Sequence, residues 1–169
     1  MAHWLPRLFR HRLLDEGDAR RALGPEALAE IERRIAASEA RHSGEIRVCV
    51  EAGLPFSYLR RNASARERAI ALFGKLRVWD TAANNGVLIY LLLAEHAIEI
   101  VADRGLLPHV DAAAWERIMA TMQSAFQEGR FAAGIEQAVD AVDALLVRHF
   151  PLADGAVNPN ELPDAPLLR

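Results

Sequence analysis

One short apolar segment constrains the fold of this chain more than any other feature. Residues 87–93 read VLIYLLL, a nearly continuous apolar run. A β-strand has this composition when both of its faces are buried, as at the centre of a sheet that helices cover on both sides. The short connection Ala94–His96 and an apolar segment at 97–102 follow directly, so we expect these two strands to form an antiparallel hairpin.

Another strand and a helix precede this hairpin. Residues 45–51 (EIRVCVE) alternate polar and apolar side chains with a period of two, which indicates a strand. Ser64 and Glu67 fit a capping box, in which each side chain accepts a hydrogen bond from the other residue's backbone N–H. This pattern predicts a helix, and we expect Ile70 and Phe73 to lie on its inward face.

The order of the elements predicts the fold class. Apolar spacing indicates further helices at about 13–23, 25–41, 112–128 and 131–148. The order is then α-β-α-β-β-α-α, and the strand–helix–strand unit implies a parallel pair with a right-handed crossover. We therefore predict an α/β fold, a three-layer α/β/α sandwich with a small mixed sheet.

The chain divides into three parts by composition. We assign residues 1–24 to an N-terminal helical segment and 25–150 to one globular domain. Residues 151–169 hold four of the eight prolines, which favours an extended or disordered tail. The same tail can instead dock on the domain through its leucines, which are Leu152, Leu162, Leu167 and Leu168.

Composition and motifs exclude several classes of function. A net charge of −3 and a pI near 6.1 argue against nucleic-acid binding, which normally needs a basic excess. Cys49 is the single cysteine, so an intrachain disulfide and a four-cysteine zinc site are impossible, and we interpret it as a buried apolar residue. The sequence has no nucleotide-binding glycine loop, no GxSxG and no HExxH. The six histidines are scattered, and we interpret them as structural or surface residues.

The N-terminal segment leaves two interpretations open. Arg7, Arg10 and Arg12 interrupt any signal-peptide core, and the longest apolar run has eight residues where a membrane span needs about 20. We therefore expect a cytoplasmic protein. Residues 4–14 can form a basic amphipathic helix on a membrane surface. Packing on the domain is the favoured alternative, because the acidic residues at 15–18 cancel the positive charge.

Polar residues flank the central strand and its hairpin partner at one end of the sheet. The loop 79–86 (WDTAANNG) precedes the strand, and we expect Val87 to lie opposite Asp103. Asn84, Asn85 and Asp103 would then gather at this end, and Asp80 can reach the same place through its loop. Carboxylate, amide and carbonyl oxygens are the ligands that Ca²⁺ and Mg²⁺ prefer.

A purely structural interpretation of the same residues is favoured by their spacing alone. Asn-Asn-Gly is a good turn sequence, because asparagine and glycine tolerate positive φ. Asp103 and Arg104 can form a surface ion pair. By the same logic Trp79 is a core or rim aromatic residue.

Several segments at their mutual spacing resemble one known family. They are SGEIRV at 43–48, LRVWDT at 76–81, NNGVLIY at 84–90, EIVADRG at 99–105 and FQEGRFAAG at 126–134. Together they resemble the TPM domain, which occurs in thylakoid-lumen, bacterial membrane-associated and animal channel-associated proteins. The resemblance spans about residues 28–148.

The resemblance implies a fold, a site and a class of partner. It implies the α/β/α sandwich and a divalent-cation site, carried over to Asp80, Asn84, Asn85 and Asp103, with Trp79, Thr81 and Arg104 as neighbours. It also implies association with membrane-anchored TPM relatives or helical LemA-type proteins. Members often carry a signal and a membrane helix, and neither pattern is visible here. The family is often called a phosphatase domain, but no nucleophile or base stands out in this sequence.

Three functions follow from these observations, in order of preference. The first is a cation-binding accessory or interaction module of the TPM type that works with membrane-associated proteins. The second is a metal-assisted phosphomonoester hydrolase, in which a metal held by Asp80 and Asp103 activates water and Arg104 neutralises charge. The third is a peripheral membrane protein anchored by its N-terminal helix.

Overall fold

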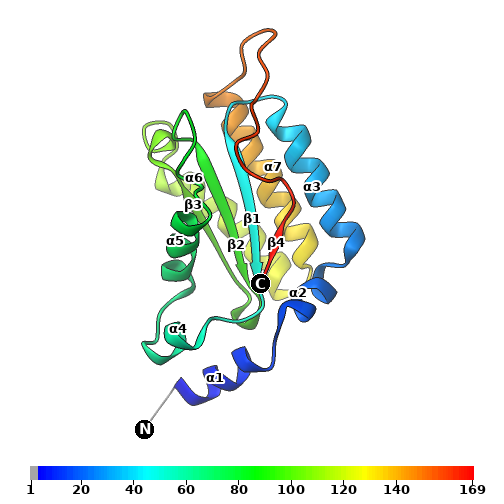
Figure 1. Cartoon of the computed structure of the whole chain (residues 1–169), viewed down its shortest axis with the longest axis vertical. Coiled ribbons are helices and arrows are strands. Elements are labelled where there is room, and N and C mark those ends of the chain that lie inside the picture. The colour runs from blue at the N-terminus through cyan, green and yellow to red at the C-terminus, as the bar shows by residue number, and fades with distance from the viewer. Residues whose placement is uncertain (1–3) are drawn as a thin grey trace.

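A mixed four-stranded sheet forms the centre of the computed structural model, which describes residues 4–169 (Figure 1). Its strands are β1 (Glu45–Glu51), β2 (Gly86–Leu92), β3 (Ala97–Ala102) and β4 (Leu167–Leu168). Their order is β3-β2-β1-β4. β1 is parallel to β2 and β4, whereas β2 and β3 form the expected antiparallel hairpin around the short 3₁₀ turn η1 (Leu93–Glu95).

Helices cover both faces of this sheet, which confirms the predicted fold class. One face carries α2 (Glu16–Leu23), α3 (Pro25–Glu39), α6 (Ala112–Gln127) and α7 (Phe131–His149). The other face carries α5 (Ala65–Lys75) and the short α4 (Phe56–Arg60), which packs against α1 (Trp4–Arg12). Figure 1 shows α5 and the α3–α7 pair on opposite sides of β1 and β2.

The two central strands are buried along their whole length, as the apolar run of β2 predicts. Val87, Ile89 and Leu91 belong to the core under α3, α6 and α7, whereas Leu88 and Tyr90 belong to the core under α5. Ala19 and Leu23 of α2 are also part of the first core. The helix before residue 25 therefore packs into the same unit as the domain.

Helix α5 begins as predicted, and of the two residues expected on its inward face only Phe73 packs against the core. The Ser64 hydroxyl accepts a hydrogen bond from the Glu67 N–H at 3.1 Å, and the Glu67 carboxylate accepts one from the Ser64 N–H at 2.9 Å. The expectation that Ile70 points inward is wrong, because 53% of this residue is exposed. Ala69 and Leu72 occupy the buried face instead.

The tail is ordered, because β1 holds it through its polar side chains. The Glu45 carboxylate accepts hydrogen bonds from the N–H groups of residues 161 and 162, each at 3.1 Å. Arg47 donates from Nη1 to the carbonyl oxygens of Pro163 and Ala165 at 2.6 and 2.5 Å. The tail therefore docks on the domain and ends as the edge strand β4. A strand of two residues, such as β4, is too short to show a periodicity in the sequence.

Helix α1 packs on the domain through two polar anchors. Arg7 Nε contacts Glu95 Oε1 at 2.5 Å, and Arg7 Nη2 donates to the Ala63 carbonyl at 2.7 Å. His11 is buried, and its Nδ1 accepts the Leu54 N–H at 2.9 Å while Nε2 lies 3.0 Å from Glu95. Over residues 4–169 no helix combines the length and apolar character that crossing a bilayer requires.

Candidate functional site

Two loops meet at the end of the sheet where β2 begins and β3 ends. The Asp103 N–H donates to the Gly86 carbonyl at 2.9 Å, and the Gly105 N–H donates to the Asn84 carbonyl at 2.9 Å. The expected pairing of Val87 with Asp103 is wrong by one residue, since Val87 faces Ala102. The connection between β2 and β3 has an even number of residues, which centres the hairpin before Glu95. Asp103 therefore continues the ladder opposite Gly86.

Two glycines allow close backbone packing at this end of the sheet. A Cβ atom at Gly105 would lie 2.5 Å from the Asn84 carbonyl oxygen, so a side chain there would push the two loops apart. A Cβ atom at Gly86 would lie 1.9 Å from the Val78 carbonyl oxygen, so a side chain there would disturb the 79–86 loop itself. Asn84 has a positive φ of 52°, which asparagine tolerates. Gly105 thus fixes the contact between the loops, and Gly86 fixes the shape of the first loop.

Asp103 is the one carboxylate of the predicted set that is buried at this contact. Its Oδ1 accepts the Arg104 N–H at 2.7 Å and so caps η2 (Arg104–Leu106). Its Oδ2 is buried and has no hydrogen-bond partner among the described residues. Buried carboxylate oxygens are normally satisfied, because burial without a partner costs free energy. This orphan oxygen is the strongest sign of a ligand at the site.

The side chains of Arg104 and Asn84 link the two loops next to Asp103. The Arg104 Nε donates to Asn84 Oδ1 at 3.3 Å. Arg104 and Asp103 do not form the side-chain ion pair that the structural interpretation allows, because Asp103 accepts from the Arg104 backbone N–H while the guanidinium binds Asn84. The guanidinium therefore holds the amide of the Asn84 loop.

Asn85 lies in the same loop but its side chain points to other partners. The residue is fully buried, and its Oδ1 accepts the Thr81 hydroxyl at 3.3 Å. Its Nδ2 donates to Ser43 Oγ at 3.2 Å. Thr81 Oγ1 in turn accepts the Asn85 N–H at 3.1 Å. Asn85 and Thr81 therefore brace the loop against the segment before β1, and Ser43 is a supporting residue that the site prediction omitted.

Asp80 and Trp79 lie on the outer side of the loop. The Asp80 carboxylate forms an ion pair with Arg77 and is 43% exposed. It borders a shallow pocket together with Glu161 and Leu162 of the tail. The Trp79 indole N–H donates to the Gly74 carbonyl at 3.3 Å, and about half of this residue is exposed. Trp79 is thus a rim aromatic residue.

The chemistry of the donor set fits a weakly held hard cation. Asp103 Oδ2 is a free carboxylate oxygen, and the Asn84 amide oxygen and loop carbonyls are neutral oxygen donors of the kind that Ca²⁺ accepts. Within residues 4–169 no three histidine, cysteine or acidic side chains gather in a way that could hold a metal ion. A cation held by a single carboxylate would bind weakly, because ligand charge sets the affinity of calcium sites.

Ser38 of α3, His42 and Asp143 of α7 form a buried cluster with the residue types of a hydrolytic triad. The Ser38 hydroxyl donates to Asp143 Oδ1 at 2.8 Å, so His42 Nε2, at 2.7 Å, donates to Ser38 Oγ. His42 Nδ1 then accepts the Gly44 N–H at 3.2 Å. The aspartate thus binds the serine rather than orienting the histidine, and Ser38 is only 2% exposed. This network is structural, as expected for His42.

The profile of the TPM domain family matches residues 17–145 of this chain. The chain belongs to the TPM domain family. Two solved structures are similar to this TPM domain. One is the NMR structure of the BA42 protein from the psychrophilic bacterium Bizionia argentinensis, with a TM-score of 0.74 and 27% identity over 86% of this chain and 94% of that one.

The second solved structure agrees in fold alone. It is the N-terminal domain of a protein from P. gingivalis, with a TM-score of 0.62 and 21% identity over 78% of this chain and 83% of that one. Among curated proteins, none matches the chain significantly.

Proposed function

We propose that this TPM domain is a divalent-cation-binding interaction module, in which a cation orders the loops at the end of the sheet. The observation that carries the proposal is the buried and unpartnered Oδ2 of Asp103. A bound Ca²⁺ or Mg²⁺ would satisfy this oxygen and add neutral oxygens from the Asn84 loop. Asp80 and Asn85 would lie near the cation without binding it through their side chains, since these side chains have other partners.

The cation would act by joining two loops that already touch. The contact rests on two backbone hydrogen bonds, donated by Asp103 and Gly105, and on one side-chain bond from Arg104. A cation between Asp103 and the Asn84 loop would add a stronger link and present one fixed surface. Membrane-associated TPM relatives or LemA-type proteins are the partner class that we propose for that surface, and the support is membership of the family.

An NMR titration tests the cation site directly. Ca²⁺, Mg²⁺ and Mn²⁺ are added separately, and the amide signals of residues 81–86 and 103–106 are followed. We expect saturable shifts, or line broadening with Mn²⁺, with a Kd on the order of 10⁻⁴ to 10⁻³ M. Asp103→Asn should abolish these changes, whereas the matched variant Asp80→Asn should keep them. Unchanged spectra with all three ions would contradict the proposal.

Phosphomonoester hydrolysis is the second function that we propose, and Arg104 is the observation that favours it. This exposed guanidinium lies at the rim of the candidate cation site, where it could neutralise a phosphate group. Turnover of p-nitrophenyl phosphate that requires both Asp103 and a divalent cation would support this function over a purely binding role.

A further inference from the structure

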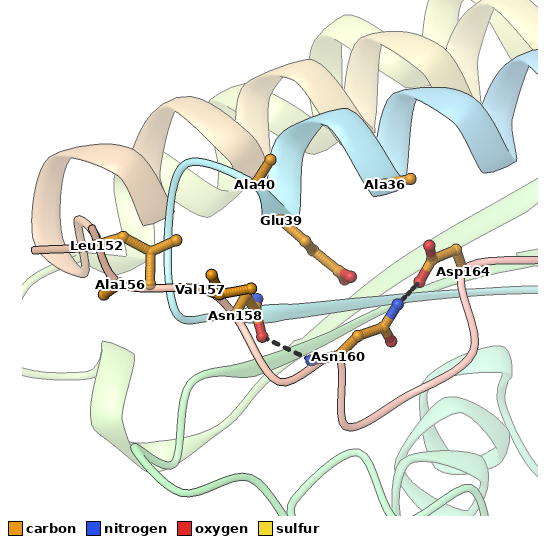
Figure 2. Close-up of a pocket in the computed structure, with 9 residues that line it drawn as sticks. All are labelled: Ala36, Glu39, Ala40, Leu152, Ala156, Val157, Asn158, Asn160 and Asp164. Atoms are coloured by element: carbon orange, nitrogen blue, oxygen red, sulfur yellow. Dashed lines mark hydrogen bonds between the residues drawn. The ribbon is translucent and has the colours of Figure 1, made fainter. Parts of the chain in front are cut away.

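A pocket of about 340 Å³ lies between the C-terminal half of α3 and the tail, far along the chain from the candidate cation site. Its apolar wall comes from Ala36 of α3, from Ala40 directly after this helix, and from Leu152 and Val157 of the tail. Its polar end holds Glu39, Asn160 and Asp164 (Figure 2). The pocket therefore has one apolar side and one acidic end.

Glu39 is a buried acid with one unused oxygen in this pocket. The residue is 3% exposed, and its Oε1 accepts the Ile46 N–H at 2.9 Å. Its Oε2 is buried and has no hydrogen-bond partner among the described residues. Figure 2 shows the carboxyl group pointing from α3 toward Asn160 and Asp164. An orphan acceptor of this kind requires either a proton or a ligand.

The tail holds the rest of the polar end in place. Asn160 Nδ2 donates to Asp164 Oδ1 at 3.1 Å, and the Asn160 N–H donates to Asn158 Oδ1 at 3.0 Å. The buried Asn158 in turn donates to the carbonyl oxygens of His42 and Gly44 at 3.0 and 3.2 Å. These hydrogen bonds hold Asp164 beside Glu39.

We infer that this pocket binds a primary alkylammonium group, with the ammonium between Glu39 and Asp164 and the alkyl stem against Ala36, Ala40 and Leu152. An ammonium has three N–H donors and one positive charge, which suit two carboxylates at one end of the pocket. The stem would be shielded from water by the apolar wall. The inference goes beyond the proposed cation site, which it does not need.

A metal ion suits this pocket less well than an ammonium. Calcium takes six to eight oxygen ligands and magnesium needs near-ideal octahedral geometry. Here the Asn158 amide is already used by its bonds to His42, Gly44 and Asn160. The apolar wall would contribute nothing to a bare ion, whereas it contacts an alkyl stem.

The surroundings of Glu39 make binding depend on pH. The pKa of Glu39 is raised to about 8, and burial is the largest cause. The Ile46 N–H opposes this rise, whereas the charge of Glu45 on β1 and the charge and side-chain hydrogen bond of Asp164 on the tail contribute to it. At pH 7 the free protein therefore carries a protonated Glu39, and the ammonium must displace that proton. Because alkylamines stay charged to about pH 10, binding should tighten about tenfold between pH 7 and pH 9.

Isothermal titration calorimetry with n-butylamine tests the inference. At pH 7 we expect binding that releases about one proton per amine, read from the dependence of the enthalpy on the buffer. Glu39→Gln should abolish binding, and Ala36→Leu should block it by filling the pocket. The matched variant Glu32→Gln makes the same substitution at an exposed position of α3 and should bind like the natural protein.

A second arm distinguishes a free amine from a lysine side chain. If Nα-acetyl-lysine N-methylamide binds more tightly than n-butylamine, the ligand is a lysine side chain of a peptide. If n-butylamine binds more tightly, the ligand is a small free amine. Either result supports the inference. The inference is overturned if neither binds, if 1-butanol binds equally well, or if Glu39→Gln folds and binds unchanged. Competition by Ca²⁺ at this pocket would also overturn it, in favour of a metal.

Discussion

Glu39 links a single buried carboxyl group to the stability of the whole chain. Burial raises its pKa to about 8 from an ordinary value near 4.5. Between these two values the folded state keeps a proton that the unfolded state has lost. The free energy of unfolding should therefore fall as pH rises through this window, by on the order of 4 kcal/mol from this group.

Glu39→Gln should remove that dependence, because the amide does not titrate. Urea unfolding at pH 5 and pH 8 measures the effect, and the natural protein should lose more stability than the variant between these values. The Glu32→Gln control should behave like the natural protein. Parallel pH profiles for the natural protein and Glu39→Gln would show that Glu39 ionises normally.

Arg104 gives a second prediction at the scale of one residue. Its guanidinium binds Asn84 and places a positive charge at the proposed cation site. Arg104→Gln should therefore raise Ca²⁺ affinity about threefold, a modest gain because the side chain is exposed and screened. The matched variant Arg77→Gln, which frees Asp80, should leave the affinity unchanged. A lower affinity in Arg104→Gln would argue against the site, and calorimetry measures both.

The edge strand β4 depends on side chains of β1 rather than on its own length. Arg47→Met should leave the carbonyl oxygens of Pro163 and Ala165 without their donor. We expect a loss of about 1–3 kcal/mol for the tail contact and faster hydrogen exchange at the Arg169 amide, which now donates to the Val50 carbonyl. The exposed Arg60→Met is the control. Unchanged protection of Arg169 would show that Arg47 does not hold the tail.

Periodicity predicted the elements whose burial follows a simple rule. The apolar run of β2 and the alternation of β1 predict these strands, because an apolar core selects the side chains that face it. Periodicity does not distinguish a docked tail from a disordered one, because Glu45 and Arg47, which hold the tail, are equally typical of a solvent-facing strand.

The candidate site was predictable in its loops but not in its side-chain partners. Sequence spacing brought the Asn84 loop and Asp103 together, and their backbone hydrogen bonds confirm that contact. It could not show that Asp80 pairs with Arg77 or that Asn85 reaches back to Ser43, because these contacts depend on how the loop turns. The burial of Glu39 could not be predicted from the sequence, because an acidic residue at a helix end is usually solvated.

One buried polar cluster joins the layers of the whole molecule. Glu51 of β1 accepts hydrogen bonds from Arg68 of α5 at 2.9 and 2.5 Å and from the Tyr90 hydroxyl of β2 at 2.7 Å. Both ionic side chains are at most 4% exposed. Burial and the Glu51 charge also raise the pKa of Tyr90. The sheet and α5 are thus connected by a charge pair that water does not reach.

Glu51→Ala should destabilise the fold by about 3–5 kcal/mol, because it leaves the Arg68 charge buried and unpaired. The triple change Glu51→Leu, Arg68→Met and Tyr90→Phe removes the charges and the hydroxyl together, and should recover most of that loss. Chemical denaturation measures both. A triple variant as unstable as Glu51→Ala would mean that packing, and not the unpaired charge, causes the effect.

The proposed cation at Asp103 should change the free energy of unfolding, and this change is the most direct test of the site. A cation that binds only the folded state should stabilise it by RT ln(1 + [L]/Kd), or about 1.4 kcal/mol at a tenfold excess of Ca²⁺ over Kd. Asp103→Ala should abolish this gain, whatever its stability without calcium, and Asp80→Ala should keep most of it. No gain for the natural protein at 10 mM Ca²⁺, or an equal gain in Asp103→Ala, would contradict the account.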